Sequence, residues 1–161
     1  MIWRCILLHL IYEVICMDKA IVVGVCIKND NNEILMVQEA NDEIRGLYNI
    51  PAGKLDSNES IMEGAIRETK EETGYDVKLD SVLCIQYLES KNILIIIFNA
   101  TIVSGNISFD KEEIMDIKWI SIEDLEAMTS NEIRSYNSNI SIIRDSKSNK
   151  RYPIEIIENI K

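Results

Sequence analysis

Histidine and paired cysteines are scarce in this chain of 161 residues. It has a single histidine, His9, and none of its four cysteines belongs to a C-x-x-C pair. Closely spaced Cys and His side chains build the zinc sites of proteins, so this composition argues against a zinc centre. The cysteine spacing also gives no sign of a disulfide framework. We therefore expect reduced thiols and a cytoplasmic protein.

Basic residues are few relative to acidic ones. The chain carries 17 Lys and Arg against 27 Asp and Glu, which gives a formal net charge of −10. Nonspecific binding to a nucleic-acid polymer or to an anionic membrane needs clustered Lys and Arg, so the charge argues against both partners. It does not exclude a small nucleotide, because a bound metal ion can reverse the sign of the charge locally.

Apolar runs long enough to cross a bilayer are also lacking. The stretch at 5–16 is apolar but short, and no small-residue cleavage site follows it. We assign residues 1–16 to an N-terminal extension of uncertain role, with Met17 as an alternative start. Neither a repeat nor a linker divides the remainder, so residues 17–161 are expected to form a single domain.

Carboxylates gather at 53–74, a segment that otherwise has the composition of a helix. Glu68, Glu71 and Glu72 share one side of that helix at i, i+3 and i+4 spacing. Like charges at this spacing repel by roughly 0.2–0.5 kcal/mol per pair. A hard divalent cation offsets the repulsion, because Mg²⁺ binds carboxylate oxygens together with the oxygens of a substrate phosphate. The segment therefore indicates a divalent-metal site.

The spacing of the segment is that of a known motif. It reads G-x5-E-x7-R-E-x-x-E-E-x-G, begins at Gly53 and directly follows Pro51-Ala52. It resembles the Nudix box of the Nudix hydrolases, which we take here as residues 53–75. The family has bulky aliphatic residues where this chain has Thr69 and Tyr75, both apolar enough to pack. The earlier run V-G-V-C-I-K-N-D-N-N-E-I-L-M-V also resembles the hairpin that opens many Nudix domains.

The resemblance implies a chemistry and a set of residues for it. Nudix hydrolases cleave a diphosphate linkage in nucleoside di- or triphosphates, or in nucleoside diphosphates linked to another moiety, with Mg²⁺ or Mn²⁺ as cofactor. The implied metal ligands are the carbonyl of Ala52 and the carboxylates of Glu68, Glu71 and Glu72. The implied catalytic residues are Glu71, Glu72 and Glu113, the last in a later loop where the family sometimes has its general base.

Other residues have less specific assignments. Arg67 is expected to pair with a neighbouring glutamate and orient it, because its guanidinium forms a bidentate fork. Glu59 either binds a further metal ion or hydrogen-bonds within its loop. Arg45, ahead of the box, either contacts a substrate phosphate or is an exposed, solvated side chain, and Gly53 is a further candidate for binding the substrate. The aromatic side chains that either stack on a base or belong to the core are Tyr48, Tyr87 and Phe98.

Hydrophobic periodicity predicts strands, a helix, further strands and further helices. The stretches at 20–28 and 33–38 are expected to form a hairpin. Ser60 and Glu63 predict a capping box at the start of a helix that ends at Gly74. The remaining elements expected are strands at 76–87, 93–102 and 114–120, a capped short helix at 121–125 and a helical region at 131–144. This order predicts an α/β fold with a mixed β-sheet covered on both faces, an α/β/α sandwich, which is also the Nudix fold.

Three alternatives stay open. The chain could be a phosphatase or pyrophosphohydrolase of small non-nucleotide diphosphates, a non-catalytic module that senses a nucleotide, or an isomerase of an isoprenyl diphosphate. A sensor would be expected to have lost box carboxylates, and all of them are present. An isomerase needs a cysteine in its site, but Cys26 and Cys84 lie in apolar runs where buried thiols are ordinary. The expected partner is a small phosphorylated substrate, and a homodimer is left open.

Overall fold

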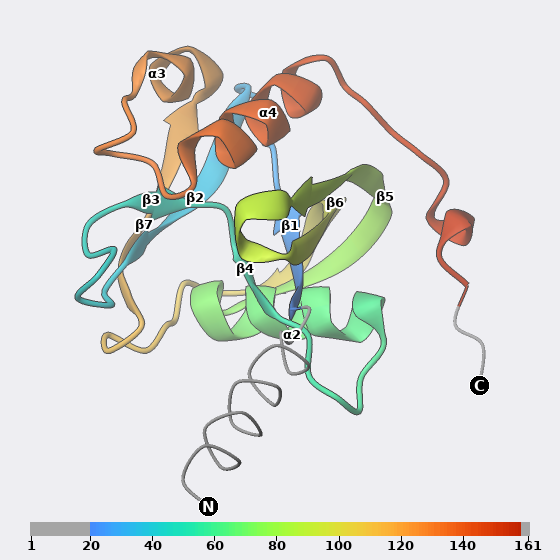
Figure 1. Cartoon of the computed structure of the whole chain (residues 1–161). Helices are drawn as coiled ribbons and strands as arrows, with labels where there is room; N and C mark the ends of the chain where they lie inside the picture. Colours follow the sequence, from blue (N-terminus) through green and yellow to red (C-terminus); the bar gives the residue numbers. More distant parts are fainter. Residues whose placement is uncertain (1–19, 159–161) are drawn as a thin grey trace, which may run out of the picture.

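The computed structural model of the chain describes residues 20–158 (Figure 1). Its strands are β1 (Ala20–Cys26), β2 (Glu33–Glu39), β3 (Tyr48–Asn49), β4 (Ala52–Lys54), β5 (Tyr75–Leu88), β6 (Ile93–Gly105) and β7 (Ile114–Ser121). Its α-helices are α2 (Ile61–Thr73), α3 (Ile122–Ala127) and α4 (Tyr136–Lys147). Two short 3₁₀ helices follow β5 and α4, namely η1 (Glu89–Lys91) and η2 (Ile154–Ile156).

The strands form two sheets. One has the order β4-β1-β6-β5 and is mixed, because β1 and β6 run parallel while β4 and β5 run antiparallel to their neighbours. The other has the order β3-β2-β7 and is antiparallel throughout. The strongly apolar β6 lies between β1 and β5, as expected for a strand that is covered on both faces.

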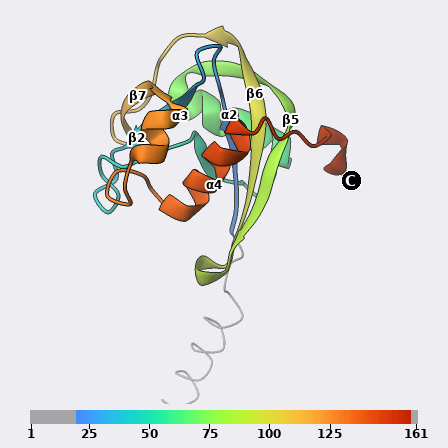
Figure 2. The ribbon, with the colours of Figure 1, turned by 90° about the horizontal axis from the view of Figure 1, so that it is seen from above.

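Helices cover the strands on two sides. In Figure 1, α2 lies on one side and α3 and α4 on the other, and the turned view of Figure 2 shows the same arrangement. Each side has its own apolar core. Ala65 of α2 packs in one core with Phe98 of β6, and Ile143 of α4 packs in the other with Leu83 of β5. The predicted α/β/α sandwich is confirmed.

The expected hairpin of 20–28 and 33–38 is wrong in its pairing. The turn does form, since the Asn29 N–H donates to the Glu33 carbonyl at 3.0 Å and Asn32 has φ 58°. Beyond one bridge between Lys28 and Ile34 the strands part, and β1 joins the mixed sheet while β2 joins the antiparallel one. Each strand finds a partner along its whole length far away in sequence, β6 for β1 and β7 for β2. These long ladders replace the local pairing.

Helix α2 begins and ends where the sequence predicts. The Ser60 hydroxyl accepts the Glu63 N–H at 3.2 Å and the Glu63 carboxylate accepts the Ser60 N–H at 2.8 Å, which completes the capping box. Gly74 adopts φ 76°, and its N–H donates to the Lys70 carbonyl at 2.8 Å. Ile66 does not belong to the inner face of α2, because 39 % of it is exposed. The buried face consists instead of Gly64, Ala65, Thr69 and Thr73.

The sequence predicts the start of α3 correctly but not the start of α4. Ser121 caps α3 as expected, because its hydroxyl accepts a backbone N–H of the first turn at 3.1 Å. Helix α4 begins at Tyr136, later than the predicted 131. Between the helices, the Tyr48 N–H donates to the Glu132 carbonyl at 2.7 Å and the Arg134 N–H to the Tyr48 carbonyl at 2.9 Å. These bonds to β3 occupy backbone groups that a helix would need, so α4 starts after them.

Some expectations fall outside the described part of the chain. The N-terminal extension at 1–16 and the alternative start at Met17 precede residue 20, so the domain boundary stays a prediction. Within residues 20–158, none of the helices combines the length and the apolar character that crossing a membrane requires.

Candidate active site

Strand β4 and helix α2 bring the two ends of the box segment (residues 53–75) together. β4 pairs with β1, where Gly24 lies opposite Ala52. A side chain at Gly24 would overlap Ala52 and the carbonyl of Pro51, so this close approach of the two strands requires glycine. α2 packs against both strands. The backbone of β4 therefore lies beside the carboxylates of α2.

Arg67 is the centre of an ion-pair cluster on α2. Its Nε and Nη2 donate to the two oxygens of Glu59 at 2.9 and 2.6 Å, and its Nη1 donates to Glu68 at 2.8 Å and to Glu71 at 2.9 Å. Nη2 also donates to the Lys54 carbonyl at 3.1 Å, which ties α2 to β4. The hydrogen bonds to Arg67 lower the pKa of Glu59, and the bonds to Glu59 above all raise the pKa of Arg67. The predicted pairing of Arg67 with box glutamates is confirmed, and Glu59 hydrogen-bonds within this cluster.

Glu68 lies directly over Gly53. A Cβ atom added to Gly53 would overlap the Glu68 carboxylate, so β4 can carry no side chain at this position. The Glu68 side chain is only 14 % exposed. Burial raises the pKa of Glu68, although the hydrogen bond from Arg67 acts in the opposite direction. Gly53 thus provides the space in which the Glu68 carboxylate sits against the strand.

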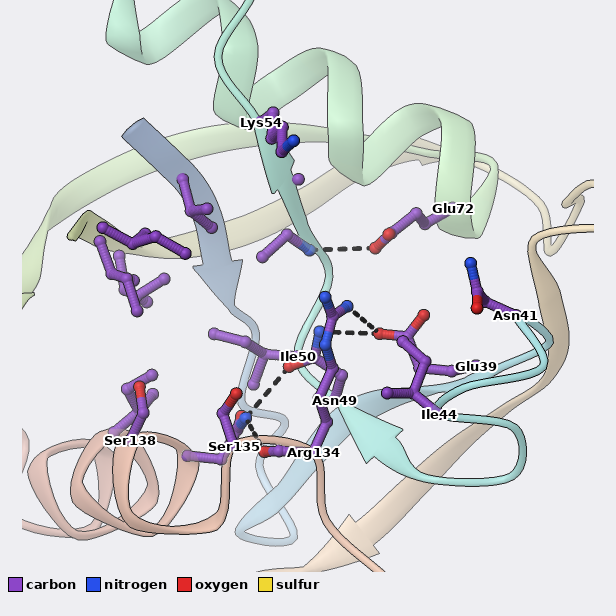
Figure 3. A pocket seen from close by; sticks show the side chains of 18 of the residues that line it. Glu39, Asn41, Ile44, Asn49, Ile50, Lys54, Glu72, Arg134, Ser135 and Ser138 are labelled. Carbon is purple, nitrogen blue, oxygen red and sulfur yellow. Dashed lines mark hydrogen bonds and ion pairs between the residues drawn. The ribbon is translucent and has the colours of Figure 1, made fainter. Parts of the chain in front are cut away.

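Glu72 bonds the backbone of β4. Its Oε2 accepts the Ala52 N–H at 3.0 Å, as Figure 3 shows. Burial raises the pKa of Glu72 well above its ordinary value, and the negative charge of Glu39 adds to the effect. A poorly hydrated carboxylate that also feels the charge of a second carboxylate is costly to ionise, and a bound cation would offset that cost.

A cavity of about 390 Å³ opens beside Glu72. Ala52 and Gly53 of β4 also lie along it. Its apolar surface is aliphatic, and much of it comes from β1, β6 and α4, through Val22, Ile93, Ile95, Ile97 and Ile142. Pockets for small molecules are usually about 300–1,000 Å³ and mostly apolar with a few polar groups, so this cavity has the size and character of a ligand site.

A polar network that we did not predict crosses the wall of this cavity. Oε1 of Glu39 accepts from Nη1 of Arg134 at 2.6 Å and from Nδ2 of Asn49 at 3.0 Å (Figure 3). Asn139 of α4 donates in turn to Oδ1 of Asn49 at 3.1 Å. All four residues line the cavity. The one available sequence signal is the charged Glu39 at the end of an apolar strand, and no motif links it to Arg134.

The remaining predicted site residues are divided between the cavity and the surface. The side chain of Glu71 is 55 % exposed, bonds Arg67 and is not among the residues that line the cavity. Glu113 does line the cavity, from the loop before β7, where its carbonyl accepts the Ala40 N–H at 2.8 Å. Arg45 is exposed and donates to the Ala40 carbonyl at 2.8 Å, within its own loop.

The cavity has no aromatic lining from the three predicted candidates. Phe98 is fully buried in the core on the α2 side. Tyr87 is exposed and donates to Asn92, and the hydroxyl of Tyr48 accepts from Lys118 at 3.1 Å. None of the three side chains lines the cavity, and Phe98 follows the core alternative.

The two described cysteines also lie away from the cavity. Burial raises the pKa of Cys26 to about 11 and that of Cys84 to about 12. Such thiols carry almost no thiolate at neutral pH and are inert. Among residues 20–158, the isomerase alternative therefore has no site cysteine to support it.

The oxygen atoms near the cavity mouth fit a divalent cation that is shared with a substrate. Glu72, Glu68 and the backbone of Ala52 supply these oxygens from α2 and β4. Among residues 20–158, no three acidic, histidine or cysteine side chains converge closely enough to hold a metal ion by themselves. Mg²⁺ does not need such a cage, since it is usually bound through one or two carboxylates, water and substrate phosphates.

Both the sequence and the fold are similar to those of known proteins. The family model of the NUDIX domain matches residues 18–139. Nudix hydrolase 8 of Arabidopsis thaliana is 34% identical over 62% of this chain, and an 8-oxo-dGDP phosphatase of Danio rerio is 43% identical over 40% of it. These matches span 29% and 20% of the two relatives, so the chain corresponds to under a third of their length. A solved NUDIX hydrolase from Nitrosomonas europaea has a TM-score of 0.77 and 26% identity, with 89% of this chain and 98% of that chain covered.

Proposed function

The chain belongs to the Nudix family, and from this premise we propose that it is a divalent-metal-dependent hydrolase of diphosphate linkages. The observation that carries the proposal is the position of Glu72. Its half-buried carboxylate has a raised pKa, bonds the Ala52 N–H and lines a cavity of ligand size. A negative group in such a place attracts a cation, and the cation in turn attracts the phosphates of a substrate.

The proposed cofactor is Mg²⁺ or Mn²⁺, which when bound would neutralise phosphate charge and lower the pKa of a bound water. Glu68, Glu72 and the carbonyl of Ala52 would hold it. Glu71 would join them after breaking its ion pair with Arg67. That pair is exposed on the Glu71 side, so breaking it costs little free energy. Arg67 meanwhile keeps Glu68 oriented through the 2.8 Å bond and stays tied to β4 through Lys54.

Glu113 is the proposed general base, with Glu71 and Glu72 as the other catalytic carboxylates. Glu113 lines the cavity on a loop, from which its carboxylate can approach an attacking water. Its neighbour Glu112 also lines the cavity and is the matched control. Glu113→Gln should lower turnover by about 100- to 10,000-fold, whereas Glu112→Gln should leave it nearly unchanged. Near-normal turnover in Glu113→Gln would move the role of the base to Glu71 or Glu72.

The proposed substrates are nucleoside di- or triphosphates, or nucleoside diphosphates linked to another moiety. The relative that is named as an 8-oxo-dGDP phosphatase supports the nucleotide class. Small non-nucleotide diphosphates are the second candidate, and the aliphatic surface of the cavity favours them. Arg45 and Gly53 stay candidates for substrate contact: Gly53 lines the cavity, and Arg45 would need a movement of its loop.

The test is the release of phosphate and pyrophosphate across a panel of nucleotides and small diphosphates. Each compound is measured with Mg²⁺, with Mn²⁺ and with excess EDTA. The proposal predicts turnover of at least one compound that needs the metal, and the preferred compound identifies the substrate class. Turnover of none, with tight binding of one, would refute the hydrolase and favour the nucleotide-sensing module.

A further inference from the structure

Arg134 and Glu39 form an ion pair whose two members are buried to very different degrees. The Glu39 side chain is 8 % exposed, whereas that of Arg134 is 41 % exposed. Glu39 is fixed from a second direction, because its Oε1 also accepts from Asn49. The Glu39 carboxylate is therefore held in place by two donors, and the guanidinium of Arg134 is the more exposed member of the pair.

Most of the hydrogen-bonding capacity of Arg134 is unused. A guanidinium has five N–H donors, and within the described part of the chain only Nη1 of Arg134 donates, to Glu39 at 2.6 Å. The remaining donors belong to a side chain that lines the cavity. A planar fork with free N–H groups, held at one corner by a buried anion, is suited to a second bidentate bond with a phosphate.

Arg134 also has the right neighbours for this task. Figure 3 shows Arg134 next to Glu39, and Glu72 lines the same cavity. Lys54 and Lys91 line the cavity too, but no bond within residues 20–158 fixes either ammonium group. Arg134 is thus the cavity cation with a defined position.

We propose that Arg134 is a phosphate-binding residue, which keeps its bond to Glu39 and uses its free N–H groups to bind a phosphate oxygen of the substrate. The inference rests on the proposed function, since it places that phosphate in the same cavity as Glu72. Glu39 and Asn49 are positioning residues in this account. They hold the guanidinium ready before the ligand arrives, which reduces the ordering that binding would otherwise require.

Binding of inorganic pyrophosphate in saturating Mg²⁺, measured by isothermal titration calorimetry, tests the proposal without any need for turnover. Arg134→Gln should weaken binding by about 10- to 100-fold, the usual effect of losing hydrogen bonds to a charged group. The matched control is Arg144→Gln, which removes the same charge from an exposed position of α4. The control should bind within about twofold of wild type. Glu39→Gln should have a smaller effect than Arg134→Gln, because an amide oxygen still accepts from the guanidinium.

Equal affinity in the Arg134→Gln and Arg144→Gln proteins would overturn the proposal, as would a wild type that binds no pyrophosphate. If Arg134→Gln does not fold, Arg134→Lys is compared with Arg144→Lys instead. Arg134→Lys keeps the positive charge but loses the planar guanidinium. Equal pyrophosphate affinity in these two variants would again overturn the proposal. Turnover by wild type with unchanged KM in Arg134→Gln would remove this inference and leave the proposed function. Pyrophosphate binding that depends on Arg134, without turnover of any compound, would keep this inference and refute the proposed function.

Discussion

Burial separates the three carboxylates that α2 presents. Glu72 lines the cavity, Glu68 is 14 % exposed over Gly53, and Glu71 is 55 % exposed. The helical repeat places all three on one side, but it cannot tell which of them β4 will cover. The sequence therefore predicts the set of carboxylates, and only the packing of β4 against α2 assigns a different environment to each.

The ion pair of Glu39 and Arg134 cannot be predicted from local sequence patterns. They pair at 2.6 Å although they lie 95 positions apart in the chain. Neither belongs to a motif, and an isolated Glu or Arg in sequence is usually a solvated surface residue. Only the bridge between β3 and the segment before α4 brings the arginine to the carboxylate.

Gly53→Ala tests whether the position of Glu68 matters for activity. The added Cβ would overlap the Glu68 carboxylate, which must then swing away. Because a misplacement of about 1 Å at a reacting site can cost about 100-fold, we expect turnover to fall by about that factor. The free energy of unfolding should change little, since the displaced group is the end of a flexible side chain. Unchanged turnover, measured beside a urea titration, would remove Glu68 from the working site.

The raised pKa of Glu72 predicts a pH dependence of stability in the metal-free protein. Above the ordinary pKa of 4.5 the unfolded chain has released this proton, while the folded protein still holds it. The folded state then binds more protons, so the free energy of unfolding falls as the pH rises from 4.5 to the raised pKa. Glu72 contributes at most about 1.4 kcal/mol per pH unit in this window.

Urea titrations with excess EDTA measure this effect from about pH 5 to pH 8. Wild type should lose stability with rising pH relative to Glu72→Gln, which has no proton to release. Parallel curves for the two proteins would show that Glu72 is not held in its protonated form by the fold.

At the scale of elements, capping residues predict the limits of a helix more reliably than hydrophobic periodicity does. The capping box of Ser60 and Glu63 and the left-handed Gly74 set the limits of α2 correctly. These signals are local, because each involves hydrogen bonds within one helical turn. The start of α4 and the partners of β1 and β2 depend on distant strands, and local periodicity misjudges them.

Ser60→Ala tests the cap of the helix that carries the carboxylates. Loss of the bond to the Glu63 N–H should lower the free energy of unfolding by about 1 kcal/mol. Ser57→Ala is the control, since Ser57 is exposed in the preceding turn. Equal midpoints for the two variants in urea would mean that this cap contributes nothing measurable to stability.

At the scale of the whole molecule, the order of elements predicts the layers but not the cavity. The sequence of strands, helix, strands and helices leads directly to the α/β/α sandwich (Figure 1). The cavity is lined by residues of both sheets, α2, α4 and the loop before β7. Its shape depends on how these parts meet, which no single stretch of sequence specifies. The box segment, whose chemistry the sequence predicts, lies beside this cavity, which the sequence does not predict.

The most direct test of the account is the turnover of wild type against Glu72→Gln on the best compound of the panel, in saturating Mg²⁺. Glutamine keeps the size of the side chain and an oxygen that can accept the Ala52 N–H, but it removes the charge that would hold the cation. We expect the turnover of Glu72→Gln to fall by about 1,000-fold or more, because binding of the cation and stabilisation of the phosphates fail together. Turnover within about tenfold of wild type would contradict the claim that Glu72 is the centre of a metal-dependent site.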